Sequence, residues 1–308
     1  MTSASPVGPL SPYPSFEDVI AQSAEFGAVF ETGTSVQGRP LVGIDVGGDG
    51  PLVTVTAGLH GIEYIGVQVA LAVLRRGAIP GVRLVVFPVL NPDGYARTLA
   101  DKGQGRVRDM RKNANGVDLN RNFPLPWNAR PSRLPFSGGS DPDSATFRGS
   151  APLAEPESQA LANWMSEHRP HASINCHSFM GSLIAARVWQ RDDWRGYTTL
   201  CRSFRDGQAG KARYLRLATP LFDVFTGELE DWQHHALQCW SVCVESFTLG
   251  ESLRQHMRAP TPFWRFNPRE PAAIAERDAV GVRAALLTAS KLPRPTRRAP
   301  ALLTRDVW

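Results

Sequence analysis

Two histidines and two glutamates lie at positions where they could take part in metal chemistry. His60 and Glu63 are three residues apart in the segment HGIE, so a helical turn or a tight loop brings both side chains to one face. His177 ends a later apolar stretch, and Glu245 lies inside another, WSVCVESF. A catalytic zinc ion usually takes three protein ligands and keeps one position for water. The set of His60, Glu63 and His177 therefore suits a zinc site.

The HGIE pair alone is weak evidence, because a histidine at a helix start and a surface glutamate would give the same spacing. Glu245 strengthens the case. Burying an unpaired carboxylate costs several kcal/mol, so a glutamate within an apolar strand must be paired or functional. A structural glutamate in a salt bridge is the alternative at that position.

Strand and helix patterns alternate around these residues. Apolar periodicity and turn signals predict strands at 41–45, 52–57, 82–90, 172–176 and 240–247, and helices at 62–75 and 156–168. The first two strands are expected to be neighbours across the turn at 47–50. Strands that alternate with helices predict an α/β fold, a mixed central sheet with helices on both faces. Ligands in such sheets collect beyond the carboxyl ends of the strands, where His60 and His177 fall.

The composition is that of an ordinary globular protein and gives little support for a nucleic-acid partner. The chain has 308 residues, 42% of them apolar and 20% charged, with a net charge of +5. This excess is small, and part of it lies in the last residues, so we expect a solvated basic tail and no nucleic-acid site.

Residues 1–15 are expected to form a poorly ordered arm, residues 16–290 a single catalytic domain, and residues 291–308 a basic tail. No apolar run of about 18 residues is present, so no membrane span is expected. The first residues do not resemble a secretion signal, which favours a cytoplasmic location. The four cysteines lack the spacing of a metal or disulfide framework and are expected to be buried thiols.

Six short segments occur in this order along the chain: HGIE (60–63), NPDGY (91–95), MRKNANGVDLNRNFP (110–124), FRGSAPLAEPES (147–158), INCHS (174–178) and VES (244–246). Together they resemble the zinc metallocarboxypeptidase family, including bacterial members related to murein tripeptide amidases. The resemblance implies a mixed sheet of about eight strands with helices on both faces. It also implies that His60, Glu63 and His177 bind one Zn²⁺ ion and that Glu245 is the general base.

The resemblance assigns further roles within 110–124. Arg111 matches the residue that stabilises the oxyanion, although a basic surface loop is an alternative because Lys and Arg crowd this stretch. Asn120 and Arg121 match the pair that holds the terminal carboxylate of the substrate. Asp118 is expected to contact His60 as the outer partner that metal-bound histidines usually need. In NPDGY, Asn91 and Asp93 are interpreted as turn-forming residues.

Asp223 and Ile62 depart from the pattern of the digestive members, and Glu230 bears on specificity; an apolar Ile62 weakens any claim of long-peptide binding. Their mobile tyrosine corresponds by spacing to Asp223, and His234 or His235 is a possible replacement. Their pocket residue corresponds to Glu230, which favours a basic terminal side chain such as lysine, arginine or the amine end of diaminopimelate. A surface glutamate is the alternative for Glu230.

The function expected from these residues is zinc-dependent hydrolysis of a C-terminal peptide bond, in a peptide or a murein peptide with a free carboxylate. The alternative enzyme is a zinc-dependent deacylase of N-acyl amino acids, of the aspartoacylase or desuccinylase type. A non-catalytic module with the same fold is disfavoured, because such relatives usually lose a metal ligand or the general base. The oligomeric state does not follow from the sequence.

Overall fold

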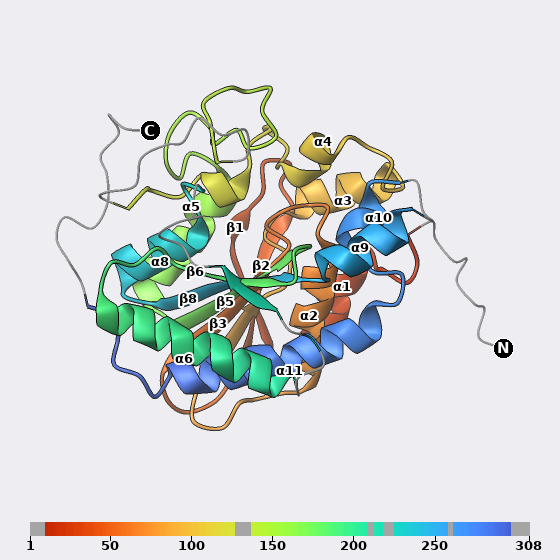
Figure 1. The fold of residues 1–308 in the computed structure, drawn as a ribbon. Coiled ribbons are helices and arrows are strands. Elements are labelled where there is room, and N and C mark those ends of the chain that lie inside the picture. The colour runs from red at the N-terminus through yellow and green to blue at the C-terminus, as the bar shows by residue number, and fades with distance from the viewer. Residues whose placement is uncertain are drawn as a thin grey trace.

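Eight strands form one sheet through the middle of the molecule (Figure 1). The computed structural model describes residues 10–126, 137–208, 212, 214–217, 225–257 and 261–296. The strands are β1 Ala28–Thr34, β2 Pro40–Gly47, β3 Leu52–Ala57, β4 Arg83–Phe87, β5 Ala172–Ser178, β6 Ser182–Ala185, β7 Leu215–Leu217 and β8 Trp240–Ser246. They lie in the order β1-β2-β4-β3-β5-β8-β6-β7. The predicted mixed sheet of about eight strands is confirmed.

The four central strands, β4, β3, β5 and β8, are parallel, and antiparallel pairs join them to β2 and β6. Side chains of β3 such as Val53 and Val55 are fully buried. Helices cover both faces of these strands, so an uninterrupted apolar run such as LVTVTA is stable there. The carboxyl ends of β3, β5 and β8 consequently meet at one edge of the sheet.

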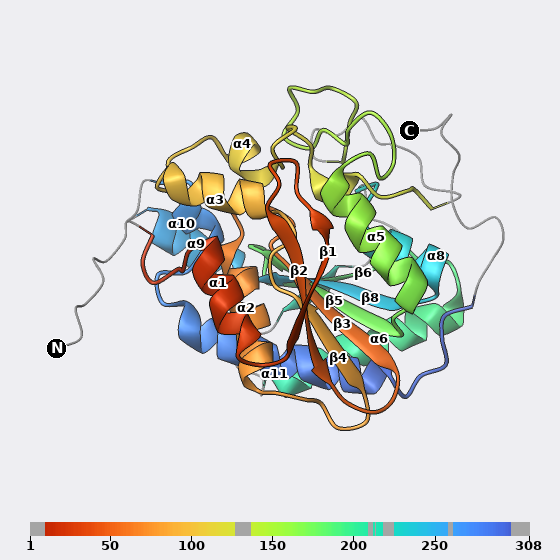
Figure 2. The same ribbon diagram turned by 180° about the vertical axis from the view of Figure 1, so that it is seen from behind.

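Helices lie on both faces of the sheet, as the two views show (Figures 1 and 2). One face carries α2, α6 and α11, with α11 packed against both of the others, and the other face carries α5 and α8. The helices are α1 Phe16–Ala24, α2 Tyr64–Arg75, α3 Pro92–Ala100, α4 Val107–Arg111, α5 Pro156–His168, α6 Arg191–Gly207, α8 Leu229–Leu237, α9 Leu249–His256, α10 Phe263–Phe266 and α11 Pro271–Ala289, with a 3-10 turn η1 Leu119–Arg121. Within the described ranges, none of them is long and apolar enough to cross a membrane.

The structure corrects two details of the predicted elements. The strands around 41–45 and 52–57 are not neighbours, because β4 lies between β2 and β3. Strand β4 pairs with both β2 and β3. This pairing is long-range and is not determined by the local turn at 47–50. Helix α2 begins at Tyr64 and not at Ile62, so the HGIE segment forms the turn before the helix. That turn carries the metal-site candidates.

The ends of the described chain are packed against the domain. Leu10 and Tyr13 fall in the expected arm but are buried, and the Tyr13 hydroxyl donates a hydrogen bond to the carbonyl of Pro268 at 2.6 Å. At the other end, the indole of Trp240 donates to the carbonyl of Pro293 at 2.9 Å. Residues 1–9 and 297–308 lie outside the described part. The four cysteines are buried free thiols, as expected.

Candidate active site

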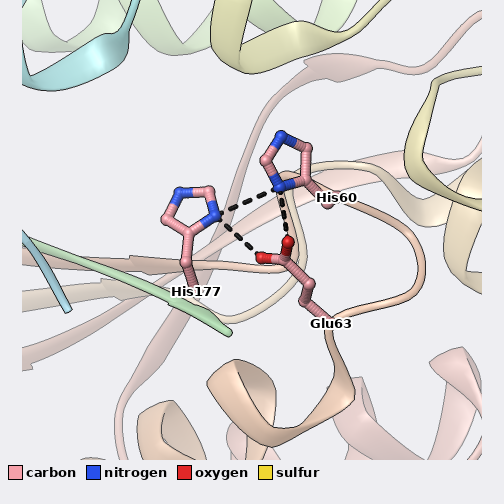
Figure 3. A group of neighbouring side chains, drawn as sticks. All are labelled: His60, Glu63 and His177. Carbon is pink, nitrogen blue, oxygen red and sulfur yellow. Dashed lines mark hydrogen bonds and ion pairs between the residues drawn. The ribbon is translucent and has the colours of Figure 1, made fainter. Parts of the chain in front are cut away.

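His60, Glu63 and His177 converge at the carboxyl edge of the sheet (Figure 3). Nδ1 of His60 lies 2.8 Å from Oε1 of Glu63, and Nδ1 of His177 lies 2.8 Å from Oε2 of the same carboxylate. The two Nδ1 atoms are 3.2 Å apart. All three side chains are buried. The turn before α2 and the end of β5, which are more than a hundred residues apart in the chain, therefore present three potential ligands to one point.

Close backbone approach shapes the turn that carries His60 and Glu63. Gly58 follows β3 with a φ of +64°, in the left-handed region that favours glycine. Gly61 packs closely against the start of α3. A Cβ atom at position 61 would lie 2.2 Å from the carbonyl carbon of Gly94. Asn91 holds that start, because its side chain accepts a hydrogen bond from the Gly94 amide at 2.9 Å. The two glycines let the chain reverse with His60 directed towards Glu63.

The outward nitrogen of His60 contacts a carboxylate that is itself paired. Nε2 of His60 lies 3.0 Å from Oδ1 of Asp118, and Nε of Arg111 donates to Oδ2 of Asp118 at 2.8 Å. A carboxylate at Nε2 favours the tautomer with its proton there, which leaves Nδ1 to bind a metal. Arg111 also lies 3.8 Å from Glu63, so it belongs to the cluster and not to a basic surface loop.

The charges of these groups set their protonation. Burial alone would raise the pKa of Glu63, but the two histidines hold it well below its ordinary value. Burial likewise opposes ionisation of Asp118, and Arg111 and His60 outweigh it and lower that pKa strongly. For His177, burial opposes the charged form, yet the Glu63 carboxylate raises its pKa to about 9. The metal-free cluster thus holds a proton on His177 that a metal ion must displace.

This donor set fits a zinc ion. Zinc binds imidazole nitrogen and carboxylate oxygen, and catalytic sites commonly use two histidines and one glutamate. One nitrogen of each histidine and a carboxylate oxygen of Glu63 lie within 4.8 Å of one another. The outward partner of His60 matches the carboxylate support that metal-binding histidines usually have.

The pairing of strands β5 and β8 places Glu245 next to His177 of the metal cluster. Strands β5 and β8 are parallel, and their register sets Glu245 opposite His177. Its Oε1 lies 3.9 Å from Sγ of Cys243. Burial and the nearby Glu63 carboxylate raise the pKa of Glu245 to about 7. Such a carboxyl group can take up a proton and release it again near neutral pH.

Asn120 and Arg121 lie on the 3-10 turn directly after Asp118. Oδ1 of Asn120 accepts a hydrogen bond from the amide of Leu229 at 2.9 Å. The Arg121 guanidinium lies 3.6 Å from Glu228 and 5.0 Å from the ring centroid of Phe225. Both residues are buried, in contact with the segment that leads into α8. The predicted carboxylate clamp thus lies between η1 and the start of α8.

Buried asparagines and glutamates hold the loop that bears the clamp. Asn113 donates through Nδ2 to Glu155 at 2.7 Å and to Glu157 at 3.0 Å. Its Oδ1 accepts from the amide of Val117 at 3.0 Å. The side chain of Asn122 donates to the carbonyl of Arg148 at 2.7 Å. The segments ANGVDLNRN and EPES are therefore parts of one loop assembly.

Glu230 is buried on α8 and faces the sheet, so the surface position considered for it does not apply. It is 1% exposed, and its Oε1 accepts a hydrogen bond from Nδ2 of Asn175 at 2.7 Å. A carboxylate oxygen of Glu230, a ring nitrogen of His177 and Sγ of Cys243 lie within 4.8 Å of one another. Glu230 thus adjoins the metal cluster on the His177 side.

Comparison with known proteins agrees with this geometry. The sequence profile of the zinc carboxypeptidase family matches residues 15–255. The chain belongs to the zinc carboxypeptidase family. Members bind one Zn²⁺ ion, and the His-Glu-His set of this chain is present in the structure.

Among curated relatives, a metallocarboxypeptidase A-like protein of Trichophyton verrucosum is 30% identical over 201 residues, which cover 60% of this chain and 42% of the relative. Human carboxypeptidase A6 is 29% identical over 176 residues, covering 51% of this chain and 39% of the relative. The matched part of the chain thus spans less than half the length of these relatives.

Among solved structures, bovine thrombin-activatable fibrinolysis inhibitor superimposes with a TM-score of 0.72 at 19% identity, covering 92% of this chain and 99% of the other. The murein-tripeptide amidase MpaA of Escherichia coli O157 gives a TM-score of 0.52 at 22% identity, covering 81% and 97%. At this level of identity the likeness shows the shared fold.

Some site residues were not identified from the sequence. Asn175, which contacts Glu230, lies two residues before His177, and a polar residue at that place in a buried strand was an available signal. Glu228 beside Arg121 carries no comparable pattern. His234 contacts the Tyr197 hydroxyl at 2.9 Å and His235 the carbonyl of Arg187 at 2.7 Å, so neither contacts the metal cluster in this structure. Asp223 lies outside the described residues.

Proposed function

We propose that this protein is a zinc-dependent carboxypeptidase that hydrolyses the C-terminal peptide bond of a short peptide. The convergence of His60, Glu63 and His177, with Glu245 in register beside His177, carries the proposal. Family membership supports it, and so does the position of Asn120 and Arg121 on the loop that begins at Asp118.

The terminal carboxylate of the substrate would bind to Arg121, whose planar guanidinium can give two parallel hydrogen bonds. Asn120 is held by the Leu229 amide and would orient the same group. Binding at this clamp would set the last peptide bond beside the metal cluster. A peptide with an amidated end would lose the charged contact, which makes the reaction specific for free C-termini.

Glu245 would accept a proton from the attacking water and pass it to the leaving amine. A bound zinc ion polarises a carbonyl oxygen and lowers the pKa of water near it. Arg111, fixed by Asp118 at 2.8 Å, would stabilise the negative charge that develops on the carbonyl oxygen. Because Arg111 is already oriented, little reorganisation accompanies that charge.

For the terminal side chain we propose a cationic group. Within the described residues, Oε2 of Glu230 has no hydrogen-bond partner, and the same holds for Oε2 of Glu245. Two carboxylates with unfilled acceptors favour an ammonium or guanidinium group beside them. Lysine, arginine and the amine end of diaminopimelate provide such a group. The murein-tripeptide amidase among the structural neighbours supports including a murein tripeptide among the candidates.

Mass spectrometry of a defined substrate pool tests this function. The zinc-loaded protein would be incubated with peptides ending in Lys, Arg, Leu, Phe or Glu and with the murein tripeptide ending in diaminopimelate, with a chelator control. We expect chelator-sensitive loss of the basic or diaminopimelate ends. Cleavage of apolar ends alone would contradict the assignment of Glu230 to the pocket.

A second pool separates the peptidase from the deacylase alternative. It contains N-acetyl-aspartate and N-succinyl amino acids, assayed under the same conditions. Deacylation of these compounds without cleavage of any peptide would overturn the proposed carboxypeptidase activity while leaving the metal site intact.

A further inference from the structure

The outward ring nitrogens of the two histidines have different surroundings. Figure 3 shows one nitrogen of each ring directed to Glu63 and the other directed away from it. Metal-binding histidines almost always donate their second N–H to a carboxylate, a carbonyl or a water. For His60 that partner is Asp118 at 3.0 Å. For His177 no direct hydrogen bond of the outward nitrogen is present among the described residues.

Glu230 is the carboxylate available to His177. One of its oxygens lies within 4.8 Å of a His177 ring nitrogen, and no direct hydrogen bond joins the two side chains in the described structure. One bridging water spans a gap of this size, because each of its two hydrogen bonds covers slightly less than 3 Å. The Oε2 atom of Glu230 is buried and has no partner among the described residues, so it can accept such a bond.

A network of neutral groups holds Glu230 in this position. The hydroxyls of Thr56 and Ser173 both donate to Oδ1 of Asn175, at 2.8 and 2.9 Å. The Glu230 carboxylate can only accept a hydrogen bond, so Nδ2 of Asn175 is the atom that faces Glu230 and Gln233, at 2.7 and 3.0 Å. Residues of strands β3 and β5 therefore hold Asn175, and Asn175 in turn holds the Glu230 carboxylate of α8.

The network continues to β8. Gln233 lies one turn after Glu230 on α8, and its Oε1 accepts a hydrogen bond from the Ser241 hydroxyl. Its Nε2 donates to the Ser173 hydroxyl oxygen at 3.1 Å. A buried network whose members are satisfied in this way is rigid. The remaining acceptor in it is Oε2 of Glu230, which is buried and has no hydrogen-bond partner among the described residues.

The thiol of Cys243 belongs to the same group of atoms and is protonated in the metal-free protein. Burial and the charges of Glu230 and Glu245 raise the pKa of Cys243 well above its ordinary value. The thiolate is the form that binds metals. A protonated thiol beside Glu230 leaves the carboxylate to interact with His177.

We infer that Glu230 is an outer carboxylate of the metal centre, which orients His177 for zinc binding as Asp118 orients His60. Asn175 is in turn the residue that orients Glu230. Glu230 is thus a positioning residue, and this role rests on the metal site of the proposed function but not on the choice of substrate. A carboxylate has several lone pairs, so Glu230 can serve His177 and a substrate cation together.

The test is zinc affinity, measured by competition with a chromophoric chelator. Glu230→Gln keeps the shape of the side chain and removes its charge. We expect zinc binding to weaken on the order of 10- to 100-fold, the usual cost of losing an outer carboxylate. Unchanged zinc affinity in a folded Glu230→Gln protein would overturn the inference, whatever happens to its activity.

Glu157→Gln is the matched control. Glu157 is 1% exposed and accepts a hydrogen bond from an asparagine amide at 3.0 Å, as Glu230 does, but it lies on α5 beside Asn113. We expect its replacement to leave zinc affinity unchanged. An equal loss of affinity in both variants would mean that removing any buried carboxylate loosens the site, and the inference would fail.

The Glu230→Asp variant and the terminal side-chain preference of the variants give two further tests of the role of Glu230. If Glu230→Gln does not fold, as judged by circular dichroism, Glu230→Asp retains the charge at a greater distance and should bind zinc more weakly than the native protein. A change in terminal side-chain preference with unchanged zinc affinity would support Glu230 in the substrate pocket and reject its action on His177. Weakened zinc binding in a protein that cleaves no peptide would support the inference and reject the proposed function.

Discussion

The two histidines of the metal cluster are held by different kinds of surroundings. On the His60 side, Asp118 pairs with Arg111 at 2.8 Å, so the carboxylate has a cation beside it. On the His177 side, the carboxylates of Glu230 and Glu245 have only the amide of Asn175 and the thiol of Cys243 as hydrogen-bond donors in the described structure.

This difference suggests different roles for the surroundings of His60 and of His177. An ion pair that is complete in the protein gives fixed geometry, which suits orientation of His60 and Arg111. A carboxylate outside an ion pair can bind a positively charged group, and Glu245, whose pKa is raised to about 7, can also take up a proton. We therefore expect the His60 side to preserve the metal site and the clamp, and the His177 side to handle protons and select the substrate.

The largest effect should come from Glu245 on the His177 side. Glu245→Gln removes the proton acceptor, and kcat should fall by about 10³-fold, within the range for loss of a general base. Zinc content, measured by mass spectrometry of the metal, should stay at one ion per chain. Turnover close to the native rate would contradict the division of roles.

The clamp on the other side should affect binding and not proton transfer. Arg121→Ala removes a charged contact worth about 1.5–3 kcal/mol, so KM for free-carboxylate peptides should rise by about 10- to 100-fold. Steady-state kinetics on a peptide and its C-terminal amide checks this. The residual activity on the amide should be unaffected, and an equal loss on both substrates would reject the clamp.

The two outer carboxylates, Asp118 and Glu230, should differ in how strongly each supports zinc binding. Asp118→Asn should weaken zinc binding by about 10- to 100-fold. The loss should be at least as large as in Glu230→Gln, because Asp118 contacts His60 directly at 3.0 Å and its replacement leaves Arg111 without its partner. Chelator competition on the two variants gives the ranking, and a larger loss for Glu230→Gln would reverse it.

Over a single pH unit, the pH dependence of zinc binding is a smaller effect. The Glu63 carboxylate raises the pKa of His177 to about 9 despite burial, so below that pH zinc must displace one proton from His177. Affinity should therefore rise about tenfold per pH unit and level off above pH 9. Calorimetry in buffers of different ionisation enthalpy measures the released proton, and its absence at pH 7 would contradict this protonation state.

The same ion pair stabilises the metal-free protein. Because the pKa of His177 is raised in the folded state, this contribution is fully present below about pH 6.5 and is lost as the pH rises through about 9. Thermal unfolding of the metal-free protein across this range should show a falling Tm. Zinc-loaded protein, whose His177 carries no such proton, is the control.

The local features of the site could be predicted from the sequence. The spacing of His60 and Glu63, the strand endings and the segment DLNRNFP are short-range patterns. The structure brings His60, Glu63 and His177 together and sets Asp118 against His60. The helix at Pro156–His168 and the strand at Leu52–Ala57 were predicted with the bounds that the structure has. These features depend on residues close together in the chain, so periodicity and turn residues reveal them.

Only the tertiary structure decided which distant segments meet. Strand β4 separates β2 from β3, although β2 and β3 are consecutive in the chain, because pairing depends on the whole sheet. The sequence left Glu230 open between a surface and a pocket position. Packing of α8 on β8 buries Glu230 against Asn175 near His177, and a contact across 55 residues leaves no local pattern to read.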